Sequence, residues 1–164
     1  MFKGDVPTLA KLLMVQYDSL LECYKNSLIN YLNYKTIDDY DERLIEDVSR
    51  DDISVDTACC IIRKLNKKKS ERNLSILLEL IRRFKEGGDW EPVSIAVKGL
   101  GYYDDNDEVK DLLKKAVVSR NWYIRKNAAE SLAQIGITDD DLNDIYSQND
   151  KYANDAIKYA VGRM

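Results

Sequence analysis

The side chains most often used for chemistry at neutral pH are scarce in this sequence, beginning with histidine, which is absent. Without it the chain has no imidazole base, no Ser–His or Cys–His nucleophile pair and no imidazole metal ligand. P-loop, GxGxxG and GxSxG motifs are also absent, and Gly99–Gly101 is only a fragment of such a glycine pattern. The residue types therefore predict a protein that is not an enzyme and holds no cofactor.

The cysteines do not form a metal or redox motif. Cys23, Cys59 and Cys60 are odd in number, include no CxxC, and the adjacent Cys59 and Cys60 cannot easily pair with each other. We expect reduced thiols that pack on helices.

Clusters of acids suggest calcium binding only superficially. A calcium loop starting at Asp104 needs Gly where Val109 stands and Glu where Lys115 stands. We therefore interpret 104–108, and likewise 139–141, as turns whose acids favour the start of the next helix. No metal site is predicted.

Charge is segregated along the first half of the chain, although the formal net charge is only −4. The acidic segment contains Asp38, Asp39, Asp41, Glu42, Glu46, Asp47, Asp51, Asp52 and Asp56. The basic segment contains Arg63, Lys64, Lys67, Lys68, Lys69, Arg72, Arg82, Arg83 and Lys85. Both segments are consistent with solvated faces or with mutual compensation. Alternatively, the acids bind a basic partner and the bases contact phosphates.

Composition points to a helical protein. Only seven Gly and two Pro occur in 164 residues, which favours long helices, and the length suits a single domain over residues 1–164. No apolar run is long enough to span a bilayer, and the first residues do not resemble a signal peptide. A cytoplasmic location is expected.

Apolar periodicity places the helices of the first half. A stripe that recurs every three or four residues predicts one helix from about Pro7–Thr8, with its residues in the core: Leu9, Leu13, Tyr17, Leu20, Tyr24, Leu28 and Tyr31. Thr36 is predicted to cap a helix over 38–49. Another helix is expected over 53–65, and a further one from the cap Ser70 to Gly87–Gly88.

The second half contains an internal repeat. Trp90, Ala96 and Leu100 align with Trp122, Ala128 and Leu132, thirty-two residues later. A third copy places Ala156 and Ala160 at the last two of these positions. Shorter helices are expected between the copies over 107–118 and 138–146, and Thr138 and Asp141 have capping-box spacing. A unit of roughly 30 residues with two helices is typical of an α-solenoid.

The run Ile124–Gly136 resembles the second helix of a HEAT repeat, which has an apolar residue, Arg, two small residues, Leu and an apolar–Gly end. Residues 89–164 carry the resemblance. Residues 1–88 are helical without the motif, as degenerate repeats or as an N-terminal cap. The resemblance implies an all-α, short right-handed solenoid of about nine helices.

The same resemblance implies a binding face on the concave side, lined by the second helices of the hairpins. Its non-core positions are Glu91, Ser94, Lys98, Tyr123, Lys126, Asn127, Glu130, Lys151, Asn154, Asp155 and Lys158. Tyrosine greatly outnumbers phenylalanine, which suits partly wet interfaces. Further contact candidates are Tyr40, Tyr102, Tyr103, Tyr146, Tyr152 and Tyr159.

The sequence favours a noncatalytic module that binds another protein. The more specific hypothesis is a bacterial inhibitor or immunity protein whose partner is a basic toxin or nuclease domain, with Asp38–Asp47 as a second candidate contact. The alternative is a nucleic-acid-binding protein, similar to the HEAT-like DNA glycosylases, that uses the basic segment Arg63–Lys85.

Overall fold

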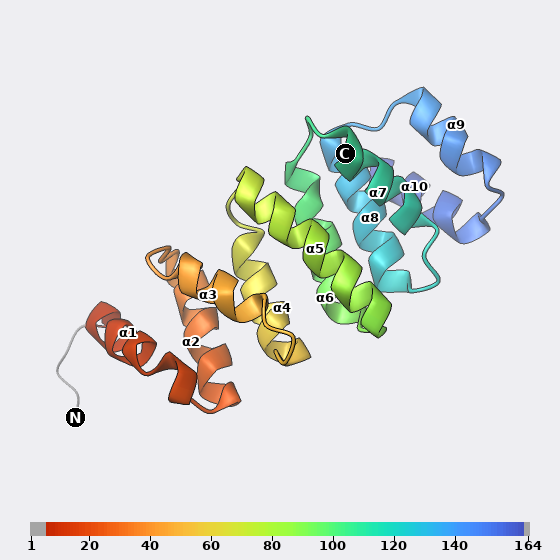
Figure 1. Ribbon diagram of the computed structural model, residues 1–164. Helices are drawn as coiled ribbons and strands as arrows, with labels where there is room; N and C mark the ends of the chain where they lie inside the picture. Colours follow the sequence, from red (N-terminus) through yellow and green to blue (C-terminus); the bar gives the residue numbers. More distant parts are fainter. Residues whose placement is uncertain (1–5, 163–164) are drawn as a thin grey trace. The chain divides into compact units, whose positions relative to one another are not determined.

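The computed structural model describes residues 6–162, and every regular element in that range is a helix. Figure 1 follows them in chain order. The first five are α1 (Val6–Val15), η1 (Tyr17–Ser19), α2 (Glu22–Lys35), α3 (Asp41–Val48) and α4 (Val55–Leu65). The remaining seven are α5 (Glu71–Gly87), α6 (Trp90–Gly99), η2 (Leu100–Tyr102), α7 (Asp107–Val117), α8 (Trp122–Ile135), α9 (Asp139–Ser147) and α10 (Lys151–Val161). The ten α-helices of the described part exceed the predicted number by one.

These helices group into two compact units, one ending at Lys64 and one beginning at Leu65. The sequence predicted one domain over residues 1–164, whereas the contacts cluster within these two parts. The first unit has its own core, with Leu32, Leu44, Ile61 and Ile62 fully buried.

The predicted long first helix is wrong, because it is interrupted between Val15 and Glu22. Leu20 and Leu21 are extended (ψ 142° and 147°). Tyr17 turns into the core, where its hydroxyl donates to Asp47 at 2.7 Å. The Ser19 hydroxyl also donates to the backbone carbonyl of Gln16, a local bond that competes with helix continuation.

Several details of this region also differ from the sequence analysis. Thr36 does not cap the start of a helix: it has φ 55° and ends α2 in the left-handed conformation. Tyr24 is exposed rather than part of the core, and Cys23 is exposed as well. Both side chains lie on the surface of α2 because its apolar face is narrow: only Leu28, Ile29 and Leu32 of that helix are buried. By contrast, Cys59 and Cys60 are buried free thiols, as predicted.

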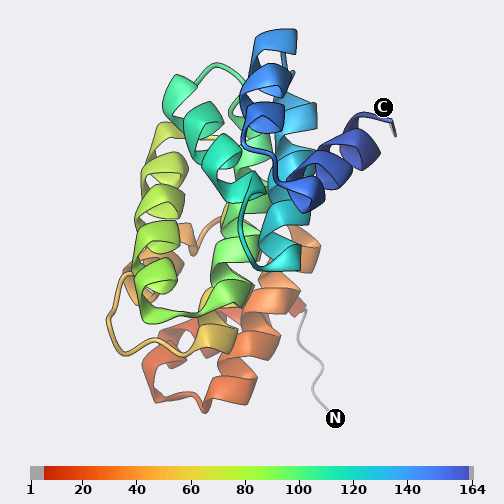
Figure 2. The same cartoon turned by 90° about the vertical axis from the view of Figure 1, so that its right-hand side faces the viewer.

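In the second unit, three successive helix pairs (α5 and α6, α7 and α8, α9 and α10) form a short solenoid. Each of the second helices packs on the next, α6 on α8 and α8 on α10. In Figure 2, α5 and α6 stand side by side. The aligned small and leucine positions Ala96, Leu100, Ala128 and Leu132 are all fully buried, which confirms the predicted repeat.

A polar ladder fixes how α8 lies against α6. The Asn127 amide donates to the backbone carbonyl and hydroxyl of Ser94, both at 2.9 Å. One turn later the Ser131 hydroxyl reaches the carbonyls of Val97 and Lys98. Because an unpaired buried polar group costs free energy, these bonds favour one register between the two helices.

Side-chain caps define the starts of the α-helices in the second unit except α6, whose N-cap residue Asp89 makes no side-chain cap bond. Ser70 accepts from the backbone N–H of Asn73, and Thr138 and Asp141 form the predicted capping box. The glycine end predicted for α5 is confirmed, since Gly88 has φ +86°. Such caps satisfy N–H and C=O groups that a helix end leaves unpaired.

Candidate protein-binding surface

Four exposed aromatic side chains lie at the starts of the second helices, and we call Trp90, Trp122, Tyr123 and Tyr152 the aromatic row. The rings of Trp90 and Tyr123 are stacked, with centroids 4.9 Å apart and planes 16° apart. Trp122 meets Tyr123 edge to face at 5.1 Å. Yet Trp122 is 56% exposed and Tyr123 53% exposed, so large apolar faces remain in water.

The side-chain caps of α8 and α10 explain why Trp122, Tyr123 and Tyr152 lie in corresponding first turns. Asn121 caps α8 by accepting from the backbone N–H of Tyr123 and Ile124, and Asp150 caps α10 by accepting from that of Ala153. The aromatic residues follow in the first turn, where a side chain has no preceding turn to pack on. Since the second helices pack on one another, their first turns fall along one edge of the unit.

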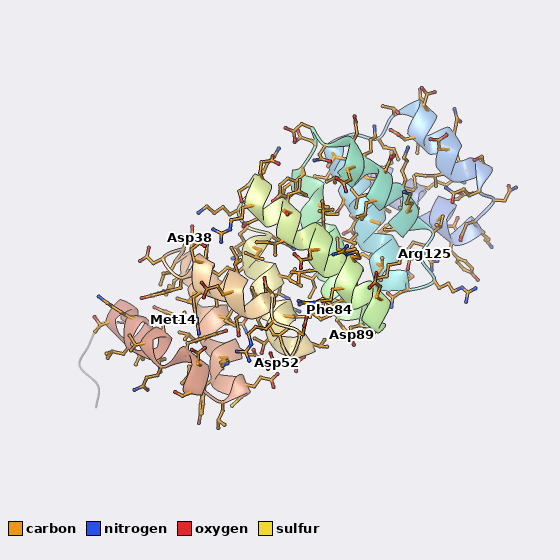
Figure 3. All side chains as sticks on the ribbon, in the orientation of Figure 1. Met14, Asp38, Asp52, Phe84, Asp89 and Arg125 are labelled. Atoms are coloured by element: carbon orange, nitrogen blue, oxygen red, sulfur yellow. The ribbon has the colours of Figure 1, made fainter. Side chains whose placement is uncertain are left out.

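Two cations accompany the aromatic row. Lys126 Nζ lies 5.6 Å from the centroid of the Trp122 ring, and the Arg125 guanidinium lies 5.1 Å from that of Tyr152. Arg125 is itself buried and donates to the backbone carbonyl of Ser119 at 2.9 Å; Figure 3 labels it near the start of α8. Cation–aromatic contacts of this kind favour a fixed orientation of the rings.

The predicted binding row is only partly accessible. Its exposed members are Lys98, Tyr123, Lys151, Asp155 and Lys158. Its half-buried members are Glu91, Lys126, Asn127, Glu130 and Asn154. Ser94 is buried and bonded to Asn127, so it holds α6 and α8 together instead of facing a partner.

The acidic segment lies in the first unit, where internal partners take up much of its charge. Asp38 and Asp41 both pair with the buried Lys64, at 2.9 and 3.1 Å. Asp47 is buried against Tyr17, so its prediction as a contact residue is wrong.

The other predicted acids of this segment remain at the surface. Glu46 pairs with Arg43 at 3.1 Å. Asp39 and Glu42 are exposed.

Burial also corrects one predicted tyrosine contact. Tyr103 is only 3% exposed, and its hydroxyl donates to the backbone carbonyl of Ser70, so it packs inside the second unit. Trp90 and Trp122 were predicted as repeat positions but not as surface residues, although both are exposed. The available signal was their position directly after a helix cap.

The described residues form no metal-ligating cluster of His, Cys, Asp or Glu. Burial raises the pKa of the Cys60 thiol, which keeps it protonated and unreactive at neutral pH. Along the described chain, no helix is both long and apolar enough to cross a bilayer.

Comparison with known proteins agrees with this geometry. The family model for HEAT repeats matches residues 77–160, slightly more than half of the chain. No curated protein and no solved structure matches. HEAT-repeat proteins are in general noncatalytic scaffolds that mediate contacts between proteins. The matched segment runs from the middle of α5 into α10 and contains the whole aromatic row. The chain therefore belongs to the HEAT-repeat family.

Proposed function

We propose that this protein is a noncatalytic module that binds another protein through the aromatic row and the adjoining surface of α6, α8 and α10. The observation that carries the proposal is the exposure of Trp90, Trp122, Tyr123 and Tyr152 along one edge. Tryptophan and tyrosine contribute most to protein interfaces because they bury large areas at little cost in side-chain entropy. The flanking charged residues supply the polar rim of such an interface: Lys126 and Glu130, which pair with each other, and the exposed Lys151 and Asp155.

Cross-linking in an extract of the native host tests this proposal. The full chain should capture specific proteins, and Trp122→Ala should lose them, because a central aromatic anchor contributes about 2 kcal/mol or more. Tyr34→Ala is the matched control, since Tyr34 is an exposed aromatic residue that lies outside the row and outside the predicted contact residues. Equal capture by both variants, or capture of no protein at low salt, would overturn the proposal.

Within this function, we retain the more specific hypothesis of an inhibitor that neutralises a toxin or nuclease domain. Its support is the small acidic chain without catalytic motifs, and the internal pairing of Asp38, Asp41 and Asp47 weakens the argument from charge. A toxin encoded beside this gene, co-expressed with the chain, provides the test. The hypothesis requires that the chain restore growth of the host.

Nucleic-acid binding by the basic segment is the competing function. Lys64 is buried in ion pairs, and Lys69 pairs with Asp104 and Asp105 at 2.8 and 3.4 Å. These pairs leave fewer of the segment's bases for phosphates. A labelled duplex at about 50 mM salt, where phosphate contacts are strong, decides the matter. A salt-dependent shift would favour this function over protein binding.

A further inference from the structure

The second unit has a groove between α5 and α7, the first helices of its first two hairpins. Its volume is about 800 Å³. Its apolar lining comes from all four helices of the first two hairpins and includes Ile81, Val97, Leu112 and Ile124. The groove exists because α6 packs along α8, whereas α5 and α7 are not among the closely packed helix pairs.

Four cations line this groove: Arg82, Lys85, Lys115 and Arg120. None of them forms an ion pair with a carboxylate within residues 6–162. Elsewhere on α7, Lys110 and Lys114 are both paired with Asp141. In a chain with a negative net charge, unpaired cations beside apolar surface favour an occupant that carries carboxylates.

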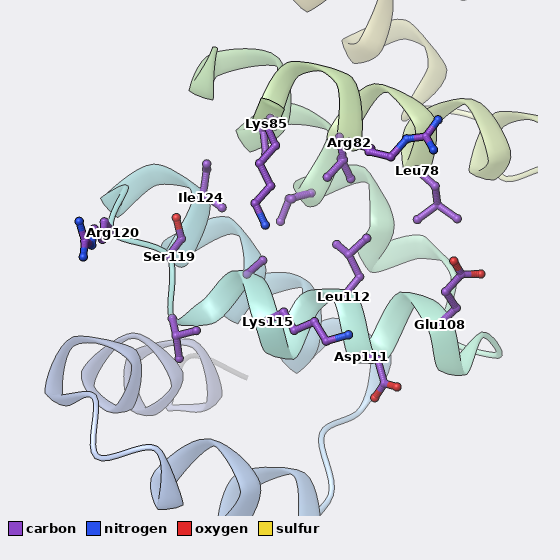
Figure 4. A pocket seen from close by; sticks show the side chains of 15 residues that line it. Leu78, Arg82, Lys85, Glu108, Asp111, Leu112, Lys115, Ser119, Arg120 and Ile124 are labelled. Atoms are coloured by element: carbon purple, nitrogen blue, oxygen red, sulfur yellow. The ribbon is translucent and has the colours of Figure 1, made fainter. Parts of the chain in front are cut away.

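The groove is also polarised along its length. Figure 4 shows Lys85, Arg120 and Ile124 at one end and Leu78 and Glu108 at the other. The acid Asp111 on its wall already has a partner, Lys114 at 3.5 Å. Carboxylates of a bound ligand are therefore most favourable at the end of the groove with Lys85 and Arg120.

We propose that the groove between α5 and α7 binds a short, acidic amphipathic helix of a partner protein, with its apolar stripe on Leu112 and Ile124 and its carboxylates toward Lys85 and Arg120. The groove proposal rests on the proposed function only in that the ligand is part of a protein. It adds a second binding site, separate from the aromatic row. The 11 residues of α7 are about 16 Å long, which fits roughly three helical turns of an occupant. Laying an amphipathic helix into an apolar groove is a common mode of recognition.

A phage-displayed library of random peptides, each about 15 residues long and able to form roughly four helical turns, tests the proposal. Selection on the full chain should enrich sequences with apolar residues at three- and four-residue spacing and a negative net charge. The most enriched peptide, labelled and titrated by fluorescence anisotropy, should bind on the order of tenfold more weakly to Lys85→Glu/Arg120→Glu. Leu112→Gln should weaken binding too, with the fold checked by circular dichroism.

The matched control is Lys98→Glu/Lys158→Glu, which makes the same change of charge on exposed lysines of the second helices. It should leave peptide binding unchanged, and so should Trp122→Ala, which tests the aromatic row separately. Enrichment of basic or neutral peptides, no enrichment at all, or equal weakening by the control variant would overturn the groove proposal. Decanoate that binds the groove where no acidic peptide does would also overturn it, in favour of a small anionic amphiphile.

Discussion

Asp141 is buried in the second unit and interacts there with Thr138, Lys110 and Lys114. Lys110 Nζ lies 2.6 Å from one of its carboxylate oxygens, and both the hydroxyl and the backbone N–H of Thr138 donate to that same oxygen. Burial alone would raise the pKa of this carboxyl, but the hydrogen bonds from Lys110 and Thr138 outweigh it and hold the pKa of Asp141 well below its usual range. The residue thus joins α9 to α7 electrostatically.

Asp141→Asn should destabilise the second unit at neutral pH by about 1–3 kcal/mol, because a buried charged acceptor is removed. A carboxyl with a depressed folded-state pKa contributes stability above its unfolded pKa of about 4, and this contribution is lost as the pH falls toward the folded value. The difference between the wild type and the variant in urea unfolding should therefore shrink below about pH 4. Asp140→Asn, an exposed acid of the same turn, is the control. A difference that stays constant with pH would contradict this account.

The features that the sequence could predict are those set by neighbouring residues, such as the ends of helices. The caps at Ser70 and Thr138 and the glycine end of α5 follow from neighbouring residues, and all are present. The exposure of the aromatic row and the burial of Ser94 depend on which helix faces the neighbouring helices cover. The sequence pattern within one repeat does not contain that information. The groove likewise depends on the separation of α5 and α7, which no short motif encodes.

At the scale of elements, predicted helices that depend on local sequence are confirmed, and the one that depends on a distant contact is wrong. Helix α4 is close to the predicted range because its apolar period is continuous. The predicted first helix breaks at Tyr17, whose partner Asp47 is thirty residues away in the sequence. Apolar periodicity predicts which face of a helix is buried. It does not predict the buried hydrogen bond between Tyr17 and Asp47, at which the chain turns.

The end of α6 depends on a close approach that only glycine permits. A Cβ on Gly99 would lie 1.9 Å from Asn66 Oδ1, and the Asn66 side chain is held by its bond to the carbonyl of Ile95 at 2.7 Å. Gly99→Ala should cost about 1–2 kcal/mol, because the loss of that hydrogen bond exceeds the gain in helix propensity. Urea unfolding followed by circular dichroism measures the change.

The matched control is Gly87→Ala, at the end of α5. There the added Cβ meets Asp89 at 3.5 Å, an ordinary contact. This substitution should be neutral or stabilise the protein by up to about 1 kcal/mol through helix propensity. If both glycine variants were equally stable, the Asn66 contact would not be what requires glycine at position 99.

At the scale of the whole molecule, the two units differ in what they contain. The second unit holds the family match beyond residue 77, the aromatic row and the groove, together with both tryptophans of the chain. The acidic segment lies in the first unit. The binding functions proposed above therefore depend on residues from Leu65 onward.

A fragment that begins at Leu65 should fold by itself, because α5 to α10 form their own core and Leu65 already accepts a hydrogen bond from Asn73 within that unit. Trp90 and Trp122 are the only tryptophans, so fluorescence reports on the second unit alone even in the full chain. The urea concentration at the midpoint of the fluorescence transition should be the same for the fragment and the full chain. In unfolding followed by circular dichroism, the full chain should show a steeper dependence of the unfolding free energy on urea, because it exposes more surface on unfolding. A disordered fragment, or a midpoint far below that of the full chain, would mean that the second unit needs the first in order to fold.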